Sequence, residues 1–354
     1  MGTKKRLRDY GISIGQLPTG PKNKITDVQG VKVGHVTLSE GAIQTGVTCI
    51  LPHRGNCFQD KVLATSYVIN GFGKTVGTIQ MEELGVLETP ILLTNTLSVG
   101  TVSAALVEYM LRDNEDIGVT TGTVNPVVGE CNDGYLNDIR GLHVQKEHAW
   151  DAICKASEDF EEGAVGAGTG MSCFGLKGGI GSASRVVRIE ALDYTVGCIV
   201  LSNFGQKGDL LIDGRPVGKW IEMQDQSGHM TERDKGSIII VLATDIPLSE
   251  RQLKRVSKRA TVGLSRTGSF VGHGSGDIVL SFSTANQVPH YPETTEVIQT
   301  VLHEDHLDSV FRAVAEAVEE SILNSMVTAK SVTGRDGNSR RSLSEYMEAW
   351  LLQS

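Results

Sequence analysis

The stretch DKGSIIIVLATD, residues 234–245, joins a charged pair, a Gly-Ser dipeptide and a run of β-branched and apolar residues. Such a run, bounded by polar residues, is typical of a buried strand. The simplest interpretation makes Gly236 and Ser237 the end of a turn. A second interpretation makes Ser237 a nucleophile at the mouth of the strand, and the bond between Gly236 and Ser237 a place where chemistry occurs. Motifs elsewhere in the chain are needed to distinguish a simple turn from a nucleophile.

Segments on both sides of this stretch alternate between strand-like and helix-like patterns. Strands rich in Val, Ile and Thr are expected at 30–38, at 45–52, from 89 onward, within 184–205 as two strands joined at Leu192-Asp193, and at 277–286. Helices are expected at 101–113, at 147–160, in a basic segment after Ser249 whose capping box includes Gln252, and at 306–329. This succession indicates a layered α/β architecture.

Polar and glycine-containing clusters mark the connections between these elements. Residues 205–209 and 224–236 are predicted to be loops. The second is long, polar and charged, so it is the expected exposed connection, and it ends at the Gly236-Ser237 dipeptide.

Composition narrows the function classes. The chain has 354 residues, enough for one large domain or two ordinary ones, and its net charge of 33 − 42 = −9 argues against a nucleic-acid binder. We expect no secretory signal, because no apolar region follows the first charges, and no apolar run is long enough to cross a membrane. The cytoplasm is the default location. Six scattered cysteines predict free thiols and no zinc site.

Residues 162–185 are rich in glycine and suggest a phosphate cradle. The spacing does not fit one. Lys177 is followed by Gly178 and Gly179, so G-x-x-x-x-G-K-[ST] is absent, and Met171 stands where G-x-G-x-x-G needs its third glycine. Close backbone packing, or a pocket wall lined by glycine, is the favoured interpretation.

Two further clusters combine glycine with carboxylate, amide or hydroxyl groups. In 127–141, Glu130 and Asn132 adjoin an Asp-Gly turn. Local turn chemistry explains them, and a pocket lip that holds an ammonium is the functional alternative. In 272–277, Ser275 and Asp277 lie two residues apart at a strand start, so both side chains can reach the same point.

Asn203 ends another expected strand, where its amide N–H is able to stabilise an oxyanion. A Ser-His-Asp triad is the rival arrangement. His273 is near Ser275 and Asp277, but sequence neighbours rarely form a working triad, and a convincing G-x-S-x-G elbow between a strand and a helix is absent.

Taken together, these motifs resemble the self-processing aminopeptidases typified by L-aminopeptidase/D-esterase and the β-peptidyl aminopeptidases. The ordered set of short motifs spans nearly the whole chain. It consists of ITDVQGVKVGH (25–35), TPILLTNTLSVG (89–100), NPVVGECNDGYLND (125–138), GLKGGIGSASR (175–185), LSNFGQ (201–206), GSIIIVLATDIPL (236–248), GSGD (274–277) and TGRDG (333–337).

The resemblance implies a single domain over 1–354 with an αββα sandwich, similar to N-terminal-nucleophile hydrolases but with different strand connectivity. It also implies one self-cleavage, at the bond between Gly236 and Ser237. The products would be an α chain, 1–236, and a β chain, 237–354. Relatives assemble as tetramers of such cleaved pairs, and the resemblance implies no cofactor or metal.

Site roles follow from the same resemblance. Ser275 and Asp277 match residues that position the Ser237 amine and hydroxyl. Asn203 and Asn132 match oxyanion donors. Glu130 matches the carboxylate that binds the free ammonium of a small peptide or amino acid amide substrate. Some relatives have Tyr in place of Asn132, and some have Glu in place of Asp277, which bears on substrate preference more than on reaction class.

The chemistry is consistent with elementary principles. A serine hydroxyl needs a base, and a newly freed α-amine titrates near pH ~8, close to working pH. Ser237 would then form an acyl-enzyme that water hydrolyses. The alternatives are a serine amidase that acts as an uncut chain, and a small-molecule binding protein without turnover. Preference among α-peptides, β-peptides, amides and esters stays open at this stage.

Overall fold

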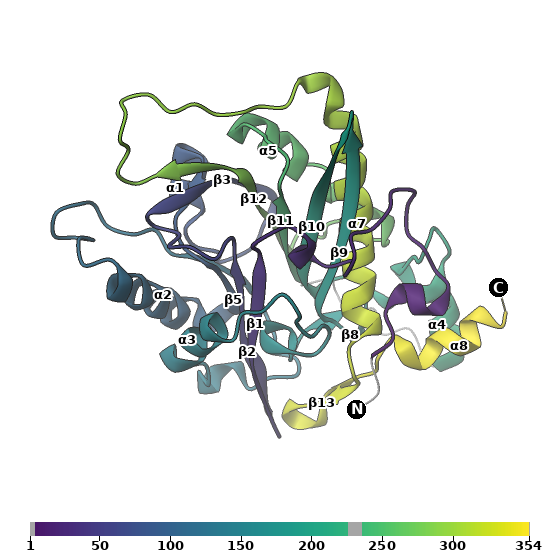
Figure 1. Cartoon of the computed structure of the whole chain (residues 1–354). Coiled ribbons are helices and arrows are strands. Elements are labelled where there is room, and N and C mark those ends of the chain that lie inside the picture. The colour runs from purple at the N-terminus through teal and green to yellow at the C-terminus, as the bar shows by residue number, and fades with distance from the viewer. Residues whose placement is uncertain (1–3, 226–235, 354) are drawn as a thin grey trace.

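The computed structural model describes residues 4–225 and 236–353 of the chain, arranged as in Figure 1. Its strands are β1 (Lys32–Glu40), β2 (Ile43–Leu51), β3 (Asp60–Gly71), β4 (Val86–Leu87), β5 (Ile91–Asn95), β6 (Val127–Cys131), β7 (Ser172–Cys173), β8 (Leu176–Lys177), β9 (Gly179–Ile189), β10 (Leu192–Asn203), β11 (Ser237–Thr244), β12 (Gly276–Pro289), β13 (Val332–Thr333) and β14 (Ser339–Arg340). Its α-helices are α1 (Thr78–Leu84), α2 (Val99–Asp113), α3 (Lys146–Cys154), α4 (Val217–Asp225), α5 (Glu250–Ser257), α6 (Ala260–Arg266), α7 (Leu307–Val327) and α8 (Ser344–Leu351).

Two mixed β-sheets form the centre of the fold. The smaller has the strand order β1-β2-β5-β6, and the larger has the order β4-β3-β12-β11-β10-β9. Each sheet contains one parallel pair, β5 with β6 and β11 with β12, among antiparallel neighbours. Parallel neighbours begin at the same edge of a sheet, so the starts of β11 and β12 lie together.

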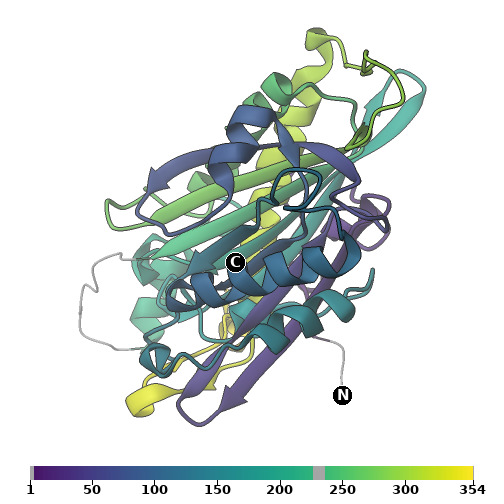
Figure 2. The same cartoon turned by 90° about the vertical axis from the view of Figure 1, so that its left-hand side faces the viewer.

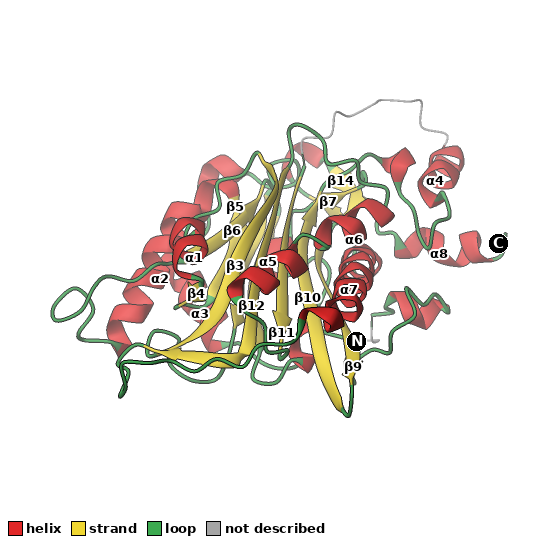
Figure 3. Cartoon of the chain, turned by 90° about the horizontal axis from the view of Figure 1, so that it is seen from above, coloured by secondary structure: helices red, strands yellow, loops and turns green. Residues whose placement is uncertain are grey.

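Helices cover the outer face of each sheet, which makes four layers (Figures 2 and 3). One apolar cluster lies between the sheets and includes Leu93 from the small sheet and Val241 from the large one. A second joins the small sheet to α2 and α3, and a third joins the large sheet to α5, α6 and α7. The expected αββα sandwich is therefore confirmed. Within the described residues, none of the helices is both long and apolar enough to cross a membrane.

Strand β11 shows why the run SIIIVLAT has no polar face. All eight of its residues are buried. Ile238, Ile240 and Leu242 belong to the cluster beneath the helices, whereas Ile239 and Val241 belong to the cluster between the sheets. Side chains alternate along a strand, so a strand covered on both faces must be apolar throughout. Residues 237–244 thus form an inner strand of the larger sheet.

Several predicted boundaries are wrong for local reasons. The turn between β9 and β10 lies at Glu190-Ala191, not at Leu192-Asp193, and Glu190 has a φ of 52°. The helix expected at 147–160 ends at Cys154. The basic helix after Ser249 has the predicted capping box with Gln252, but it is split into α5 and α6.

The long loop expected at 224–236 lies mostly outside the described residues, which stop at 225 and resume at 236. Residues 224 and 225 belong to the end of α4. Strand β6 occupies 127–131, where the sequence suggested a hairpin or loop. Strand β3, of 12 residues, was not predicted at all.

The glycine-rich segment packs backbone against backbone, as the favoured interpretation held. A Cβ atom at Gly181 would lie 2.0 Å from the Ser321 carbonyl oxygen in α7. One at Gly168 would lie 2.6 Å from the Ile180 nitrogen, and one at Gly178 would lie 2.4 Å from the Ser202 oxygen. Gly181 therefore allows β9 to approach α7 closely, whereas Gly168 and Gly178 allow their segments to pack against β9 and β10.

This packing predicts that Gly181→Ala destabilises the protein by about 1–3 kcal/mol, because the new methyl group has to displace backbone atoms. Gly100→Ala is the matched control: no atom lies within 4 Å of its added Cβ, and it is in helix α2. The control should leave stability unchanged or raise it by up to about 1 kcal/mol. Thermal and denaturant unfolding measure both, and an equal effect of the two substitutions would contradict the close-packing argument.

Candidate active site

Three adjacent strands of the large sheet bring the predicted polar residues into one row. Ser237 opens β11 and pairs with Asn203 at the end of β10. On its other side it pairs with Gly276 at the start of β12. Ser275 and Asp277 flank Gly276 in the sequence. Strand pairing alone therefore gathers residues that are up to 74 positions apart, 277 − 203, at one edge of the sheet.

The Ser237 hydroxyl lies against the peptide group that precedes it. The side chain is buried, and its Oγ donates a hydrogen bond to the Gly236 carbonyl oxygen at 2.8 Å. The Gly276 N–H donates to the Ser237 Oγ at 3.3 Å and to the Gly236 oxygen at 3.3 Å. The carbonyl group of Gly236 is thus in contact with both a hydroxyl and a backbone N–H.

Gly236 is required by space. A Cβ atom at this position would lie 2.3 Å from the Asn203 carbonyl oxygen and 2.3 Å from the Phe204 Cα. Both are backbone atoms of the neighbouring chain segment, which cannot move aside without disturbing β10. The absence of a side chain at residue 236 therefore lets the Gly236–Ser237 peptide lie directly against the end of β10.

Ser275 and Asp277 form a buried pair on the two sides of Gly276, the residue that pairs with Ser237. Their exposed fractions are 1% and 2%, and the Ser275 Oγ donates to Asp277 Oδ1 at 2.6 Å. Residues two positions apart near a strand start project to the same side, which explains the contact that the sequence suggested. The Asn70 amide nitrogen donates to the Ser275 carbonyl oxygen and to the Gly272 carbonyl oxygen at 3.2 Å. Asn70 thereby stabilises the loop that carries Ser275.

The Asn203 side chain has one defined orientation. Its Oδ1 accepts a hydrogen bond from the Ser172 N–H at 2.8 Å, and its Nδ2 donates to the Asn132 carbonyl oxygen at 3.0 Å. An amide nitrogen carries two hydrogens, so the second remains able to bind an oxygen. Asn132 joins the cluster through its backbone, since its own Oδ1 accepts from the Gly134 N–H at 2.9 Å in a local turn. The structure thus places Asn132 beside Asn203, and its side-chain oxygen has the turn role that the sequence also suggested.

Glu130 lies in β6 with only 2% of its side chain exposed. Its Oε1 accepts from the Lys74 N–H at 2.8 Å, and its Oε2 accepts from the Thr96 hydroxyl. A Cβ atom at Gly73 would lie 3.6 Å from this Oε1 and 3.8 Å from the Gly276 Cα. Residue 73 therefore lies between the Glu130 carboxylate and the Ser237 row, which makes Glu130 part of the same site.

Asn70 and Thr96 are two site residues that the sequence did not predict. Thr96 follows β5, whose Thr94 pairs with Glu130 in the parallel β5–β6 ladder. Recognition of that ladder would have placed the Thr96 hydroxyl next to Glu130. No comparable signal identifies Asn70, because strand β3 itself was not predicted.

Other nucleophile and base candidates fit this site poorly. Burial, with the charges of Glu130 and Asp277, raises the pKa of the Cys131 thiol well above its usual value, which disfavours the reactive thiolate. His273 is exposed to solvent. In the described part of the chain, no cluster of three or more His, Cys, Asp or Glu side chains suits a metal ion.

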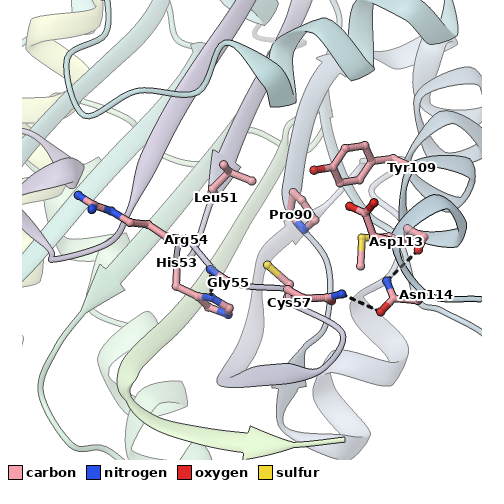
Figure 4. Close-up of a pocket in the computed structure, with 11 residues that line it drawn as sticks. Leu51, His53, Arg54, Gly55, Cys57, Pro90, Tyr109, Asp113 and Asn114 are labelled. Carbon is pink, nitrogen blue, oxygen red and sulfur yellow. Dashed lines mark hydrogen bonds between the residues drawn. The ribbon is translucent and has the colours of Figure 1, made fainter.

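A separate cavity of about 250 Å³ lies at the far end of β5 (Figure 4). Leu51, Pro90, Tyr109 and Asp113 are among the residues that line it. Pro90 directly precedes β5. Glu130 lies at the other end of this strand, where it contacts Thr96, the first residue after β5. Five residues of strand separate the two by about 15 Å. This cavity is therefore separate from the row that contains Ser237, and Ser237 is not among its lining residues.

Comparison with known proteins shows the family to which the chain belongs. Residues 23–340 match peptidase family S58. The chain belongs to peptidase family S58. It is 40% identical to the β-peptidyl aminopeptidase BapA of Sphingosinicella microcystinivorans, an alignment that covers 94% of this chain and 88% of that protein.

Solved structures agree with this assignment. A Pyrococcus horikoshii OT3 protein of known crystal structure is 54% identical, with a TM-score of 0.92 and coverage of 97% of this chain and 98% of that one. The L-aminopeptidase D-Ala-esterase/amidase of Ochrobactrum anthropi is 36% identical, with a TM-score of 0.89 and coverage of 99% and 98%. That structure is described as a prototype of the serine aminopeptidases and a new variant of the Ntn hydrolase fold.

The resemblance inferred from the motifs is thus confirmed, together with the fold that it implied. The S58 chain is a hydrolase of the aminopeptidase class. This assignment excludes the interpretation as a binding protein without turnover.

Proposed function

We propose that the chain is a self-processing aminopeptidase whose nucleophile, Ser237, becomes N-terminal when the bond between Gly236 and Ser237 is cut. The contact of the Ser237 hydroxyl with the Gly236 carbonyl group is the observation that carries this proposal. The nearby Gly276 N–H adds a donor to the same carbonyl oxygen. Backbone donors of this kind stabilise the charge that develops on a carbonyl oxygen under attack.

In the proposed self-cleavage, the Ser237 Oγ attacks the Gly236 carbonyl carbon and gives up its proton. The C–N bond between residues 236 and 237 then breaks, and the departing nitrogen takes up a proton. The products are an ester between Gly236 and the Ser237 Oγ, and a free α-amine on Ser237. Water hydrolyses the ester, which releases the carboxylate of chain 1–236 and restores the hydroxyl on chain 237–354.

In the proposed turnover, the free α-amine of Ser237 removes the hydroxyl proton while Oγ attacks the substrate carbonyl. The buried Ser275–Asp277 pair flanks Gly276, the residue that pairs with Ser237, and is proposed to supply acceptors that orient the amine. Asn203, aided by Asn132, stabilises the oxyanion. The acyl-enzyme forms as the amine of the substrate leaves, and water then releases the acyl group as a carboxylic acid.

Glu130 is proposed to bind the free ammonium of the substrate. A carboxylate with little exposure gains more from an ionic partner than an exposed one does, because solvent screening is weaker. Both of its oxygens already accept one hydrogen bond each, so the group is held in one orientation. Substrates are accordingly short peptides, amides or esters of amino acids with a free amino group.

Assembly and location complete the proposal. We infer a tetramer of cleaved pairs in the cytoplasm. Family resemblance supports the assembly, and light scattering should give about four times the mass of one protomer. None of the six cysteines forms a disulfide, and five of them are buried, which supports a reducing compartment.

Self-cleavage predicts a specific result for Ser237→Ala. Without the attacking hydroxyl, the purified variant should have the intact mass of the full chain. The wild type should give two species that correspond to 1–236 and 237–354. Intact mass spectrometry, with a denaturing gel, decides the matter; a wild type that stays whole while active would favour the uncut serine amidase instead.

The role of Glu130 predicts that Glu130→Gln lowers kcat/KM for free amino acid anilides by at least ~10-fold, since a charge-assisted hydrogen bond contributes about 1.5–3 kcal/mol. N-acetylated substrates should be poor for the wild type. Glu88→Gln is the matched control, because Glu88 is also buried and accepts from the Asn125 N–H at 2.7 Å and from Gln80 at 3.0 Å. Equal hydrolysis of free and acetylated substrates by the wild type would remove this role.

An α-amine base predicts activity without a histidine. Processed His273→Ala should stay within about 10-fold of the wild type, whereas loss of a triad base costs several decades of rate. The base has to be neutral, so the rate should rise as pH increases through the titration of the amine, near pH ~8 before local shifts. Carbamylation of the Ser237 amine should abolish turnover. An inactive His273→Ala beside an active carbamylated enzyme would restore the serine–histidine mechanism.

A further inference from the structure

Lys177 is a buried cation that the proposed mechanism does not use. It lies in β8, and its side chain is completely shielded from solvent. Its Nζ donates three hydrogen bonds, to the carbonyl oxygens of Gly168 at 2.9 Å, Met171 at 2.8 Å and Gly178 at 2.8 Å. An ammonium group has three hydrogens, so each one has its own acceptor. Such complete pairing is what a buried charge requires.

The three acceptors all belong to one short segment, which Lys177 closes into a ring. Met171 precedes β7, and Gly178 follows β8, so the ammonium group joins the two ends of the β7–β8 hairpin. The Gly178 N–H also donates to the Met171 carbonyl oxygen at 3.0 Å. We define residues 168–178 as the lysine-closed loop.

This loop orients the amide of Asn203. Ser172, in β7, is inside the loop, and its N–H donates to the Asn203 Oδ1 at 2.8 Å. Because the amide oxygen is bound there, the amide nitrogen points the other way, toward the Asn132 carbonyl oxygen. Asn203 itself is paired with Ser237 across β10 and β11. A half-turn of the amide would place an Asn203 N–H against the Ser172 N–H. The position of Ser172 therefore selects the orientation that presents a donor.

The loop also contacts the segment that carries Asn132. A Cβ atom at Gly170 would lie 2.9 Å from the Cβ of Asp133 and 2.1 Å from the Gln44 carbonyl oxygen, so Gly170 packs directly on the Asp133 side chain and on the Gln44 backbone. Asp133 is completely buried. Burial raises its pKa to about 7, and burial lowers the pKa of Lys177 to about 7, while attraction between the two favours the charged form of each. The carboxylate is thus the nearby countercharge of the ammonium group.

We propose that Lys177 is a positioning residue for the oxyanion site: its ammonium group closes the loop 168–178, which holds the Asn203 amide in the orientation that stabilises the tetrahedral intermediate. The proposal rests on the function proposed above for Asn203. Lys177 itself does not touch the substrate. Its effect passes through the Ser172 N–H.

An oxyanion donor acts mainly in the transition state, so its misplacement lowers kcat and changes KM little. Lys177→Met keeps the length of the side chain and removes its charge and donors. We expect kcat to fall by about 10- to 100-fold while KM stays within ~3-fold of the wild type. This loss is smaller than the 10²- to 10³-fold loss of kcat that follows complete removal of an oxyanion donor, because Asn203 itself remains. Affinity for an α-aminoboronic acid, which forms a tetrahedral adduct on serine, should fall by the same factor as kcat.

Lys61→Met is the matched control. Lys61 is also buried, and its Nζ donates to the Phe58 carbonyl oxygen at 2.8 Å. It lies near the start of β3, whereas the end of that strand pairs with Gly276. Lys61→Met should therefore keep kcat within 2-fold even where it lowers thermal stability. Equal losses of kcat in the two lysine variants would overturn the proposal.

A double-mutant cycle with Asn203→Ala separates this inference from the proposed function. Rates are normalised to the processed fraction measured by intact mass. We expect Lys177→Met to have no further effect on kcat once Asn203 is alanine, because both act through one donor. Additive effects would overturn the role of Lys177. An unchanged kcat in Asn203→Ala alone would overturn the oxyanion role of Asn203 instead.

If Lys177→Met does not fold, Asp133→Asn provides the second variant. It removes the countercharge and keeps the shape, so the ammonium group in the loop loses stabilisation. The expected result is again a lower kcat with a KM close to that of the wild type, and loss of the effect in the Asn203→Ala background. A folded Asp133→Asn enzyme with the kcat and boronate affinity of the wild type would contradict the proposal.

Discussion

The register of β11 between β10 and β12 is the constraint on which the site depends. Both faces of β11 are buried, one beneath the helices and one between the sheets. A slip of one residue would exchange every side chain between the two faces, so the packing of two apolar layers specifies the register. That register pairs Ser237 with Asn203 on one side and with Gly276 on the other. The energy that defines the active-site row thus comes from apolar residues that take no part in the chemistry.

Close backbone approach is the second requirement. Gly236 lies against the end of β10, and a Cβ atom at Gly276 would lie 2.7 Å from the Phe72 carbonyl oxygen. Where side chains are absent, backbone N–H groups come within reach of a reacting carbonyl. The same device recurs in the lysine-closed loop, where Gly170 packs on Asp133. Glycine at these positions therefore lets segments distant in the chain pack directly against one another.

The polar residues of the site differ in how far they were predictable. Ser275 and Asp277 were predicted to lie together because a spacing of two residues puts both side chains on one side of a strand. The structure shows the contact, a hydrogen bond of 2.6 Å from the Ser275 hydroxyl to the Asp277 carboxylate. Glu130 was singled out as a carboxylate near a turn, although it lies in a buried strand. Thr96 was missed because its contact with Glu130 depends on the pairing of β5 with β6. Long-range pairing leaves no local periodicity that a single sequence reveals.

The sequence by itself determined the apolar strand at 237–244, the capped helix after Ser249, the layered α/β class and, through ordered motifs, the family. These features depend on local periodicity, local hydrogen bonds or short motifs, and each of these signals arises from residues that are close together in the sequence. Only the tertiary structure decided that Lys177 closes a loop and that Ser172 orients the Asn203 amide. The residues next to Lys177 in the sequence exclude a phosphate-binding motif, but they do not reveal which groups its ammonium binds. Which carbonyl oxygens surround the ammonium group is settled by the packing of segments distant in the chain.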